Sequence, residues 1–255
     1  MIINKNELNK FFNELLNPHD FSDYGPNGLQ IDGKEDIQKV TFSVSATRHS
    51  VEKSVELKSD ALVVHHGLFW NFHGAKTITG PFAKRIKPLI ENNINLWGYH
   101  LPLDAHLEVG NAASLAKKLA LEHLISFGDY KGSPTGISGQ WSRPRKAKEL
   151  KNDLEKILGR SVLHAPAYDN REIKNVGIIT GGANSEWKLA VKNSLDAYIT
   201  GEMSEHDWHE SSESDIHMFA GGHHATERLG PLALMEAVKN KFNIECEFID
   251  SENPA

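Results

Sequence analysis

Three apolar runs in this chain lead directly into side chains of the kind that bind metals, and this pattern limits the possible folds most strongly. Each run is short enough to be one buried strand, and imidazole and carboxylate groups follow it. The runs are 61–64 before His65 and His66, 94–99 before His100 and Asp104, and 218–220 before His223 and Glu227. We interpret the three strand ends as parts of one metal site.

The segment 221–227 is the most informative of the three. Two glycines end the apolar run, and a helix-like stretch with His223 and Glu227 follows. Residues four apart lie on the same face of a helix, so this imidazole and this carboxylate point the same way. Such a pair offers two ligands to one divalent ion.

Strands and helices alternate along the chain, which predicts an α/β fold with parallel strands. Expected helices cover 5–17, 47–58, 81–93, a segment from 111, 146–158, 204–212 and a segment that ends near 241. Expected strands cover 39–44, 60–64, 94–99, 161–164, 176–180, 196–200, 215–220 and 244–249, with loops at 23–30 and 68–80. In open α/β sheets, sites form beyond the carboxyl ends of strands, where all three candidate ligand groups stand.

The turn-rich stretch 128–146 is the best candidate for a boundary between two halves. The sequence therefore predicts a first α/β half at 1–127 and a second at 128–255. The C-terminal helix and strand are expected to pack back on the first half.

The two halves resemble each other in their spacing. Val40 and Asp60 are 20 residues apart, and so are Val176 and Asp196. In this register Glu202 stands opposite His66. A duplication explains the match, but two unrelated βαβ units also look alike, and the sequence leaves both explanations open.

Composition narrows the class of protein. The chain has 255 residues, 39% of them hydrophobic, which is enough for one large core or two small ones. Its net charge is −6 and it has no long basic stretch, which argues against duplex nucleic acid as the main partner. A single cysteine, Cys246, excludes an intrachain disulfide framework and a thiolate zinc site.

Targeting signals are the next class of feature to consider. The first residues lack the apolar core of a signal peptide, and no apolar run approaches the roughly 20 residues of a membrane span. We therefore expect a soluble cytoplasmic protein without a membrane partner.

The adjacent pair His65-His66 suggests two ions rather than one. Neighbouring side chains on a strand point in opposite directions, so both reach one site only if the strand breaks there, which Gly67 permits. A carboxylate with two oxygens can bridge two ions. The assignment is His65 and Asp104 on the first ion, His66 and His223 on the second, and Glu227 on both.

This ligand count favours catalysis over a structural role. It gives roughly three protein ligands per ion, whereas closed structural zinc sites use four. Paired metals activate water and clamp a substrate oxygen, so we expect metal-assisted hydrolysis. His100 is the candidate catalytic residue, as a proton shuttle or a partner that orients a ligand, and a packing role stays open. No P-loop, dinucleotide fingerprint or Gly-x-Ser-x-Gly elbow competes with this interpretation.

Five motifs together resemble the GTP cyclohydrolase I type 2 homologue family, also called dinuclear metal centre proteins. The match is closest to the short bacterial YbgI-like form and covers essentially the whole chain. The motifs are Gly28–Gln30, Asp60–Gly67, His100–Asp104, Thr200–Glu202 and Gly222–Glu227.

The resemblance implies two interlinked α/β domains of similar topology with a dinuclear metal cleft between them. It also implies a toroidal homohexamer. The five assigned ligands occupy positions that look like the family's metal ligands, and His224 stands where many members have an aromatic residue. The family name implies hydrolytic opening of the guanine ring of GTP, for which Arg48, Lys76 or the metals are candidate phosphate contacts.

Two functional hypotheses follow. The first is a dinuclear metal-dependent hydrolase of a small polar substrate, with nucleotide-like molecules among the candidates. The alternative is a non-catalytic metal-binding protein that forms an oligomeric ring. Histidine and carboxylate ligands suit two divalent ions per chain chosen from Zn, Mn, Fe, Co and Ni.

Overall fold

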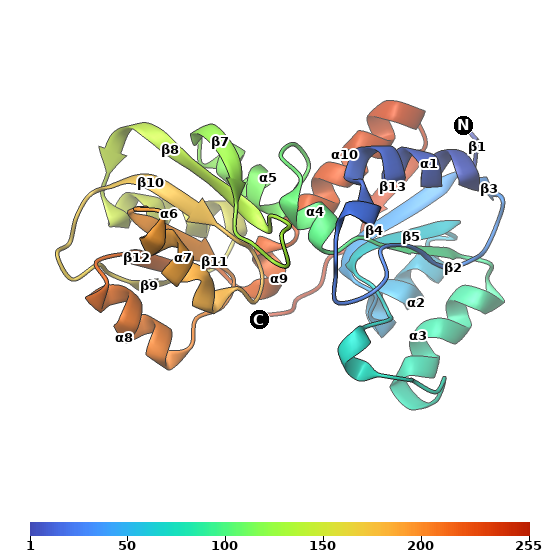
Figure 1. Cartoon of the computed structure of the whole chain (residues 1–255). Coiled ribbons are helices and arrows are strands. Elements are labelled where there is room, and N and C mark those ends of the chain that lie inside the picture. The colour runs from blue at the N-terminus through green and yellow to red at the C-terminus, as the bar shows by residue number, and fades with distance from the viewer. The chain divides into compact units, whose positions relative to one another are not determined.

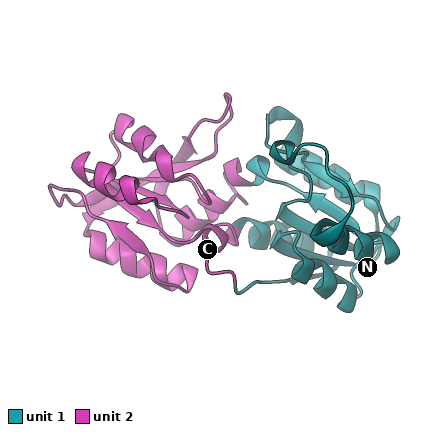
Figure 2. Ribbon diagram, turned by 90° about the horizontal axis from the view of Figure 1, so that it is seen from below, with its two compact units in different colours: residues 1–103, 230–252 teal, residues 104–229, 253–255 magenta.

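The computed structural model describes residues 1–255, which form two compact α/β units. Unit 1 comprises 1–103 and 230–252, and unit 2 comprises 104–229 and 253–255 (Figure 2). The sequence suggests a division at 127/128, whereas the chain passes between the units at 103/104, 229/230 and 252/253. The second passage carries a C-terminal helix and strand back to unit 1, so the two units are interlinked along the chain.

Unit 1 is built on a five-stranded sheet in the order β13-β4-β5-β6-β2. The first four of these strands run parallel and β2 runs antiparallel to β6. The strands are β2 (Gly28–Ile31), β4 (Lys39–Ser45), β5 (Ala61–His66), β6 (Asn95–Gly98) and β13 (Glu245–Phe248). A separate two-stranded sheet is formed by β1 (Ile3–Asn4) and β3 (Asp36–Ile37).

Helices cover both faces of this sheet (Figure 1). α1 and α10 lie on one face and α2 and α3 on the other, where Val51 and Ile86 pack against Leu62. The helices are α1 (Lys5–Leu16), α2 (Arg48–Glu56), α3 (Gly80–Glu91), α4 (Leu101–Ala105) and α10 (Leu229–Phe242), with short 3₁₀ turns at Pro18–Asp20 and Asn71–His73. Because both faces are covered, the central strand β5 begins with four consecutive buried apolar residues, 61–64.

Unit 2 contains a six-stranded mixed sheet in the order β7-β8-β10-β11-β12-β9, with β10, β11 and β12 parallel. The strands are β7 (Glu122–Phe127), β8 (Gly136–Arg145), β9 (Leu163–Ala165), β10 (Ile173–Ile178), β11 (Ala197–Thr200) and β12 (His217–Ala220). The helices are α5 (Asn111–Lys118), α6 (Ala147–Leu158), α7 (Trp187–Lys192), α8 (Glu205–Glu213) and α9 (His223–Thr226), with a 3₁₀ turn at Asn184–Glu186.

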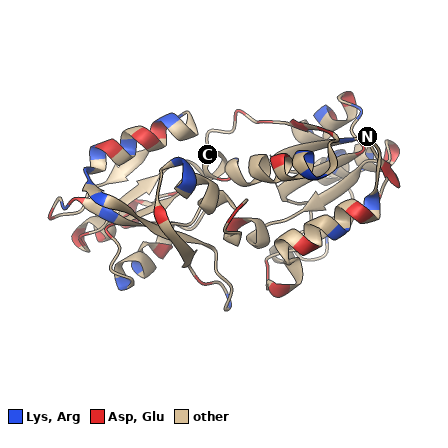
Figure 3. Ribbon diagram, turned by 90° about the horizontal axis from the view of Figure 1, so that it is seen from above, with Lys and Arg blue, Asp and Glu red and all other residues tan.

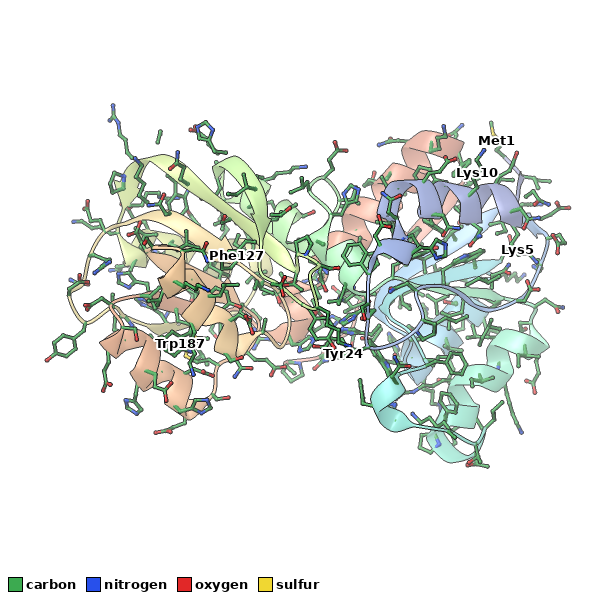
Figure 4. The ribbon with its side chains drawn as sticks, viewed as in Figure 1. Met1, Lys5, Lys10, Tyr24, Phe127 and Trp187 are labelled. Carbon is green, nitrogen blue, oxygen red and sulfur yellow. The ribbon has the colours of Figure 1, made fainter.

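Strand alternation divides the interior of unit 2 into two cores. On β11, Ile199 packs with Leu154 of α6, whereas its neighbour Tyr198 packs with Trp187 of α7. Trp187 is almost fully buried, and its Nε1 donates to Asp207 at 3.0 Å (Figure 4). Burial of each such side chain stabilises the fold by about 1.5–3 kcal/mol.

The two units share one βαβ arrangement. Val40 pairs with the residue after Asp60, and Val176 pairs in the same way with the residue after Asp196. Asp60 Oδ2 accepts from two backbone N–H groups at the start of β4, and Asp196 Oδ2 does the same at the start of β10. This hydrogen-bonding pattern, which Asp60 and Asp196 share, explains the 20-residue spacing seen in the sequence and supports the duplication.

The surfaces of both units carry mixed charge. Lys and Arg alternate with Asp and Glu along the exposed helices (Figure 3), and several of these side chains pair one turn apart. None of the helices has the length and apolar character that crossing a membrane requires.

Candidate metal centre

In unit 1, three histidines gather where two neighbouring parallel strands end. β5 ends with His65 and His66, and His100 follows the last residue of β6 by two positions. The ring nitrogens that these residues offer all lie within 4.8 Å of one another. His65 is fully buried, and the other two are half-buried. The strand ends therefore bring these side chains together, as the sequence predicts.

The turn after His66 requires glycine because another side chain comes very close. β5 ends at His66, and the rings of His65 and His66 lie 4.6 Å apart between centroids. A Cβ on Gly67 would stand 2.3 Å from Nε2 of Gln30. β5 thus runs two residues beyond the predicted strand 60–64 and includes both histidines, and Gly67 leaves room for the close approach of Gln30.

Hydrogen bonds orient both histidines of the pair. Nδ1 of His65 lies 3.0 Å from the carbonyl oxygen of Tyr99, which can only accept. Nδ1 therefore carries the proton and Nε2 the lone pair. Nδ1 of His66 lies 2.9 Å from Oγ of Ser45. Histidines that bind metals are typically held in this way, with one nitrogen bonded to the protein.

His100 is held by a buried carboxylate. Its Nδ1 lies 2.7 Å from Oδ1 of Asp23, and its backbone N–H donates to Asn27. Oδ2 of Asp23 accepts from the backbone N–H of Leu101 at 2.9 Å. Burial raises the pKa of Asp23, but the hydrogen bonds and the charge of His100 bring this pKa below its usual value. Asp23 is therefore ionised, and Nδ1–H of His100 donates to it.

The segment predicted as a loop at 23–30 is a loop only over residues 23–27. Residues 28–31 form β2, which pairs antiparallel with β6. Oε1 of Gln30 accepts from the backbone N–H of Leu68 at 2.8 Å, and its Nε2 donates to the carbonyl of Pro26. Tyr24, labelled in Figure 4, sets its ring edge-on to His100 at 5.8 Å. Asp23, Asn27 and Tyr24 of this segment thus contact His100.

In unit 2, His223 lies between two carboxylates. Its Nδ1 is 2.6 Å from Oε1 of Glu202, and its Nε2 is 3.1 Å from Oε2 of Glu227. Burial lowers the pKa of His223, but the bonds and charges of Glu227 and Glu202 outweigh it and raise this pKa to about 9. The i, i+4 geometry predicted for His223 and Glu227 is confirmed.

Asp104 supplies a second buried carboxylate to unit 2. It lies in α4, a helix that the sequence does not predict, and it is 6% exposed. Its Oδ1 accepts from Asn111 at 2.9 Å and from Thr180 at 3.2 Å. It offers an oxygen within 4.8 Å of one from Glu227. Asp104 and Glu227 are therefore neighbouring carboxylates, and Glu227 also contacts His223.

Gly181 leaves room for the carboxylate of Glu227. Its φ is +70°, a conformation that side-chain-bearing residues rarely adopt. A Cβ there would stand 2.1 Å from Oε1 of Glu227. The backbone after β10 is thus shaped around this carboxylate.

The residues fit divalent metal ions of the borderline class. Imidazole nitrogens and carboxylate oxygens are the ligand set for Zn, Mn, Fe, Co and Ni, and each imidazole here has its Nδ1 tied to a protein acceptor or hydroxyl. Unit 1 supplies His65, His66 and His100, and unit 2 supplies Asp104, His223 and Glu227. The assignment of five ligands to two ions stays a prediction.

Three other residues considered in the sequence, Cys246, Arg48 and His224, have surroundings typical of structural residues. Burial raises the pKa of Cys246 to about 11, which opposes a nucleophilic role. Arg48 donates from Nε to Glu52 at 2.6 Å along α2, as an exposed ion pair. His224 is 6% exposed, and its backbone N–H donates to Ala255.

Sequence comparison places these residues in a wider context. Residues 3–254 match the family model described as Duf34/NIF3 (NGG1p interacting factor 3). The chain is 40% identical over 255 residues to the GTP cyclohydrolase 1 type 2 homolog of Vibrio cholerae, covering 99% of this chain and 100% of that one. It is 42% identical over 253 residues to the homolog of Pasteurella multocida, with the same coverage.

Solved structures agree with this result. The chain is similar to the protein ybgI, described as of unknown function, with a TM-score of 0.91 at 40% identity over 99% of this chain and 100% of that one. For TTHA1606 from Thermus thermophilus, the TM-score is 0.89 at 30% identity with the same coverage. Reduced HcgD from Methanocaldococcus jannaschii shares the fold, with a TM-score of 0.85 at 20% identity over 98% of this chain and 99% of that one.

Proposed function

The chain belongs to the Duf34/NIF3 family, and from that premise we propose that it is a hydrolase that depends on two divalent metal ions. Its proposed ligands are His65 and Asp104 for one ion, His66 and His223 for the other, and Glu227 for both. The substrate is a small polar molecule, and nucleotide-like compounds are the first candidates because relatives carry the name GTP cyclohydrolase 1 type 2 homolog.

One observation carries the proposal: hydrogen bonds to the protein orient three of the histidines. Nδ1 of His65 is bonded to a carbonyl, Nδ1 of His100 to Asp23 and Nδ1 of His223 to Glu202. For His65 and His100 the hydrogen bond leaves Nε2 as the nitrogen that faces away from the protein partner, whereas Nε2 of His223 faces Glu227, the proposed shared ligand. Packing histidines need no such repeated arrangement, whereas metal ligands do.

The ligands come from both units, and the covalent chain keeps parts of the two sets close. His100 and Asp104 are four residues apart, so the backbone holds their Cα atoms within about 14 Å of each other. Glu227 stands two residues before the point where the chain returns to unit 1. The proposed donors thus flank the passages between units.

The residues of the chain have distinct parts in this proposal. When bound, paired ions would supply Lewis acidity and a water that ionises near neutral pH. Asp104 and Glu227 bring negative charge that offsets the charge of the ions. Asp23 and Glu202 fix the tautomers of His100 and His223, and His100 holds a proton at Nδ1 beside the site.

Assembly and location belong to the same proposal. A homohexameric ring in the cytoplasm is expected, and light scattering should give a mass of six 28.4 kDa chains. A mass equal to one chain at working concentration contradicts the ring.

The test combines metal analysis with a substrate screen. Wild type, Glu227→Gln and the control Glu205→Ala are purified without added metal, and nucleotide hydrolysis is followed with metal content. Glu205 is a suitable control because its side chain is 86% exposed on α8. Activity and metal should fall together in Glu227→Gln and stay unchanged in Glu205→Ala.

The same experiment distinguishes the non-catalytic alternative. Loss of metal from Glu227→Gln without change in a measured activity contradicts the hydrolase. Blank substrate screens together with a ring that dissociates on chelation support a metal-dependent assembly instead.

A further inference from the structure

An aromatic segment beside the unit 1 histidines has no role in the proposed chemistry. It runs from Phe69 to Lys76 and includes the 3₁₀ turn at Asn71–His73. Phe72 is 68% exposed and Phe69 is 38% exposed. Patches of large apolar side chains that are exposed on a protein surface often mark a binding site.

The aromatic rings form an ordered platform. Trp70 stacks on Phe72 with centroids 5.6 Å apart and an interplanar angle of 26°. Its edge meets the ring of His100 at 5.1 Å, and its Nε1 donates to the carbonyl of Gly67 at 3.2 Å. Trp70 therefore joins the exposed platform to the histidine cluster.

Two pockets meet at this platform. The outer pocket has a volume of about 340 Å³, within the range of small-molecule sites. Its walls are Phe69, Trp70, Asn71, His73, Gly74 and Lys76. A narrower inner pocket shares Phe69 and Trp70 and reaches His65 and His100. A molecule in the outer pocket would thus lie next to the proposed ligands.

The charge of this region is opposite to that of the whole chain. Residues 61–90 contain no Asp or Glu but hold Lys76, Lys84, Arg85 and Lys87, in a chain of net charge −6. Nζ of Lys76 lies 3.1 Å from Nδ1 of His73 and 4.6 Å from the ring centroid of Phe82. No carboxylate pairs with Lys76, so its charge is available to an anion.

We propose that Phe69–Lys76 is the specificity subsite of the metal centre and binds a planar aromatic ring that carries an anionic group, as in a nucleotide. The ring stacks on Phe69 and Trp70, which line the outer pocket, and the anionic group pairs with Lys76. This inference rests on the proposed function, because the subsite serves chemistry at the adjacent histidines.

Binding of three probes tests the ring-binding part and the anion-binding part of the subsite separately. GTP offers a ring and phosphates, guanosine offers the ring alone, and inorganic triphosphate offers the charge alone. Calorimetry would measure each probe with wild type, Phe69→Leu and Lys76→Gln. Both side chains are exposed, so the variants should fold.

The expected pattern is specific. Phe69→Leu weakens GTP and guanosine by about five- to tenfold and leaves triphosphate unchanged, because stacking is lost. Lys76→Gln weakens GTP and triphosphate by about three- to tenfold and leaves guanosine unchanged. The matched controls Ile78→Ala and Lys87→Gln, which do not line the pocket, bind all three probes as wild type does.

Two results would overturn the subsite. One is equal binding of every probe by wild type and both variants. The other is a lower oligomeric mass for Phe69→Leu with GTP binding unchanged, which makes the platform an interface between copies. Metal content measured on the same samples tests the proposed function separately: normal metal with no GTP binding by wild type removes the subsite alone.

Discussion

Replacing Glu202 with alanine tests how the second carboxylate of unit 2 acts. Glu202 is not among the five proposed ligands, yet its Oε1 lies 2.6 Å from Nδ1 of His223. The hydrogen bond fixes the imidazole tautomer and increases the basicity of the opposite nitrogen. Glu202→Ala should therefore weaken the ion that His223 binds more than the other ion.

The expected loss of metal affinity follows from one term that increases it and two that reduce it. Loss of a carboxylate that orients a metal-binding histidine typically costs 10- to 100-fold in affinity. The Glu202 side chain is 52% exposed, so water screens part of its interaction. Glu202 also helps to raise the pKa of His223, so its loss weakens competition from protons. We expect about a tenfold loss at neutral pH, equivalent to ~1.4 kcal/mol.

The assay is competition with a chromogenic chelator, which resolves the two ions as two steps. In Glu202→Ala one step should shift and the other should stay, with an unchanged melting temperature. Glu202→Gln, which keeps an acceptor, should fall between alanine and wild type. Identical competition curves for wild type and Glu202→Ala would refute the orienting role.

Two further predictions concern the folded state. Burial and the charges of His217 and Lys151 lower the pKa of His164 from 6.5 to about 4, so the unfolded chain binds a proton there that the folded chain does not. The contribution of His164 to the free energy of unfolding is therefore complete above pH 6.5. This contribution falls by about 1–2 kcal/mol toward pH 4, after a discount for the partial exposure of the side chain. Urea unfolding of His164→Phe should lack this term; an unchanged pH profile contradicts it. Gly181→Ala should lose about 2–4 kcal/mol because a Cβ would meet Glu227, whereas Gly159→Ala, with φ +71° and open space, should lose about 1 kcal/mol. Equal losses in thermal unfolding would contradict this account.

Much of the candidate site could be predicted because local pattern and topology agree. Residues 61–64 form a continuous apolar run, as expected for a central parallel strand, and two histidines follow it. His223 and Glu227 have the spacing of one helical turn. In a parallel sheet such strand ends share one edge, so sequence order alone places these groups correctly within each unit.

The segment around Asp23 could not be interpreted from sequence because its partners are distant. Asp23 bonds His100 and Leu101, which are 77 and 78 residues away, and Gln30 bonds Leu68 across 38 residues. Asp, Asn, Gly and Pro in a short stretch indicate a turn on local grounds. The hydrogen bonds that give the stretch its role have no local periodic signal.

The elements β7 and α4 also escaped prediction, for different reasons. β7 is exposed at most of its positions, so Glu122–Phe127 shows little of the apolar alternation that identifies a strand. α4 has only five residues, Leu101–Ala105, too few for a helical period. Pro102 fits its first turn, but proline equally indicates a loop.

The most direct test of the central claim is anomalous X-ray diffraction from crystals of the metal-loaded protein. Two peaks per chain are predicted, one bound by His65 and Asp104 and one by His66 and His223. Both should lie about 2.0–2.2 Å from an oxygen of Glu227. A single peak, or peaks held by donors of one unit only, would contradict the account.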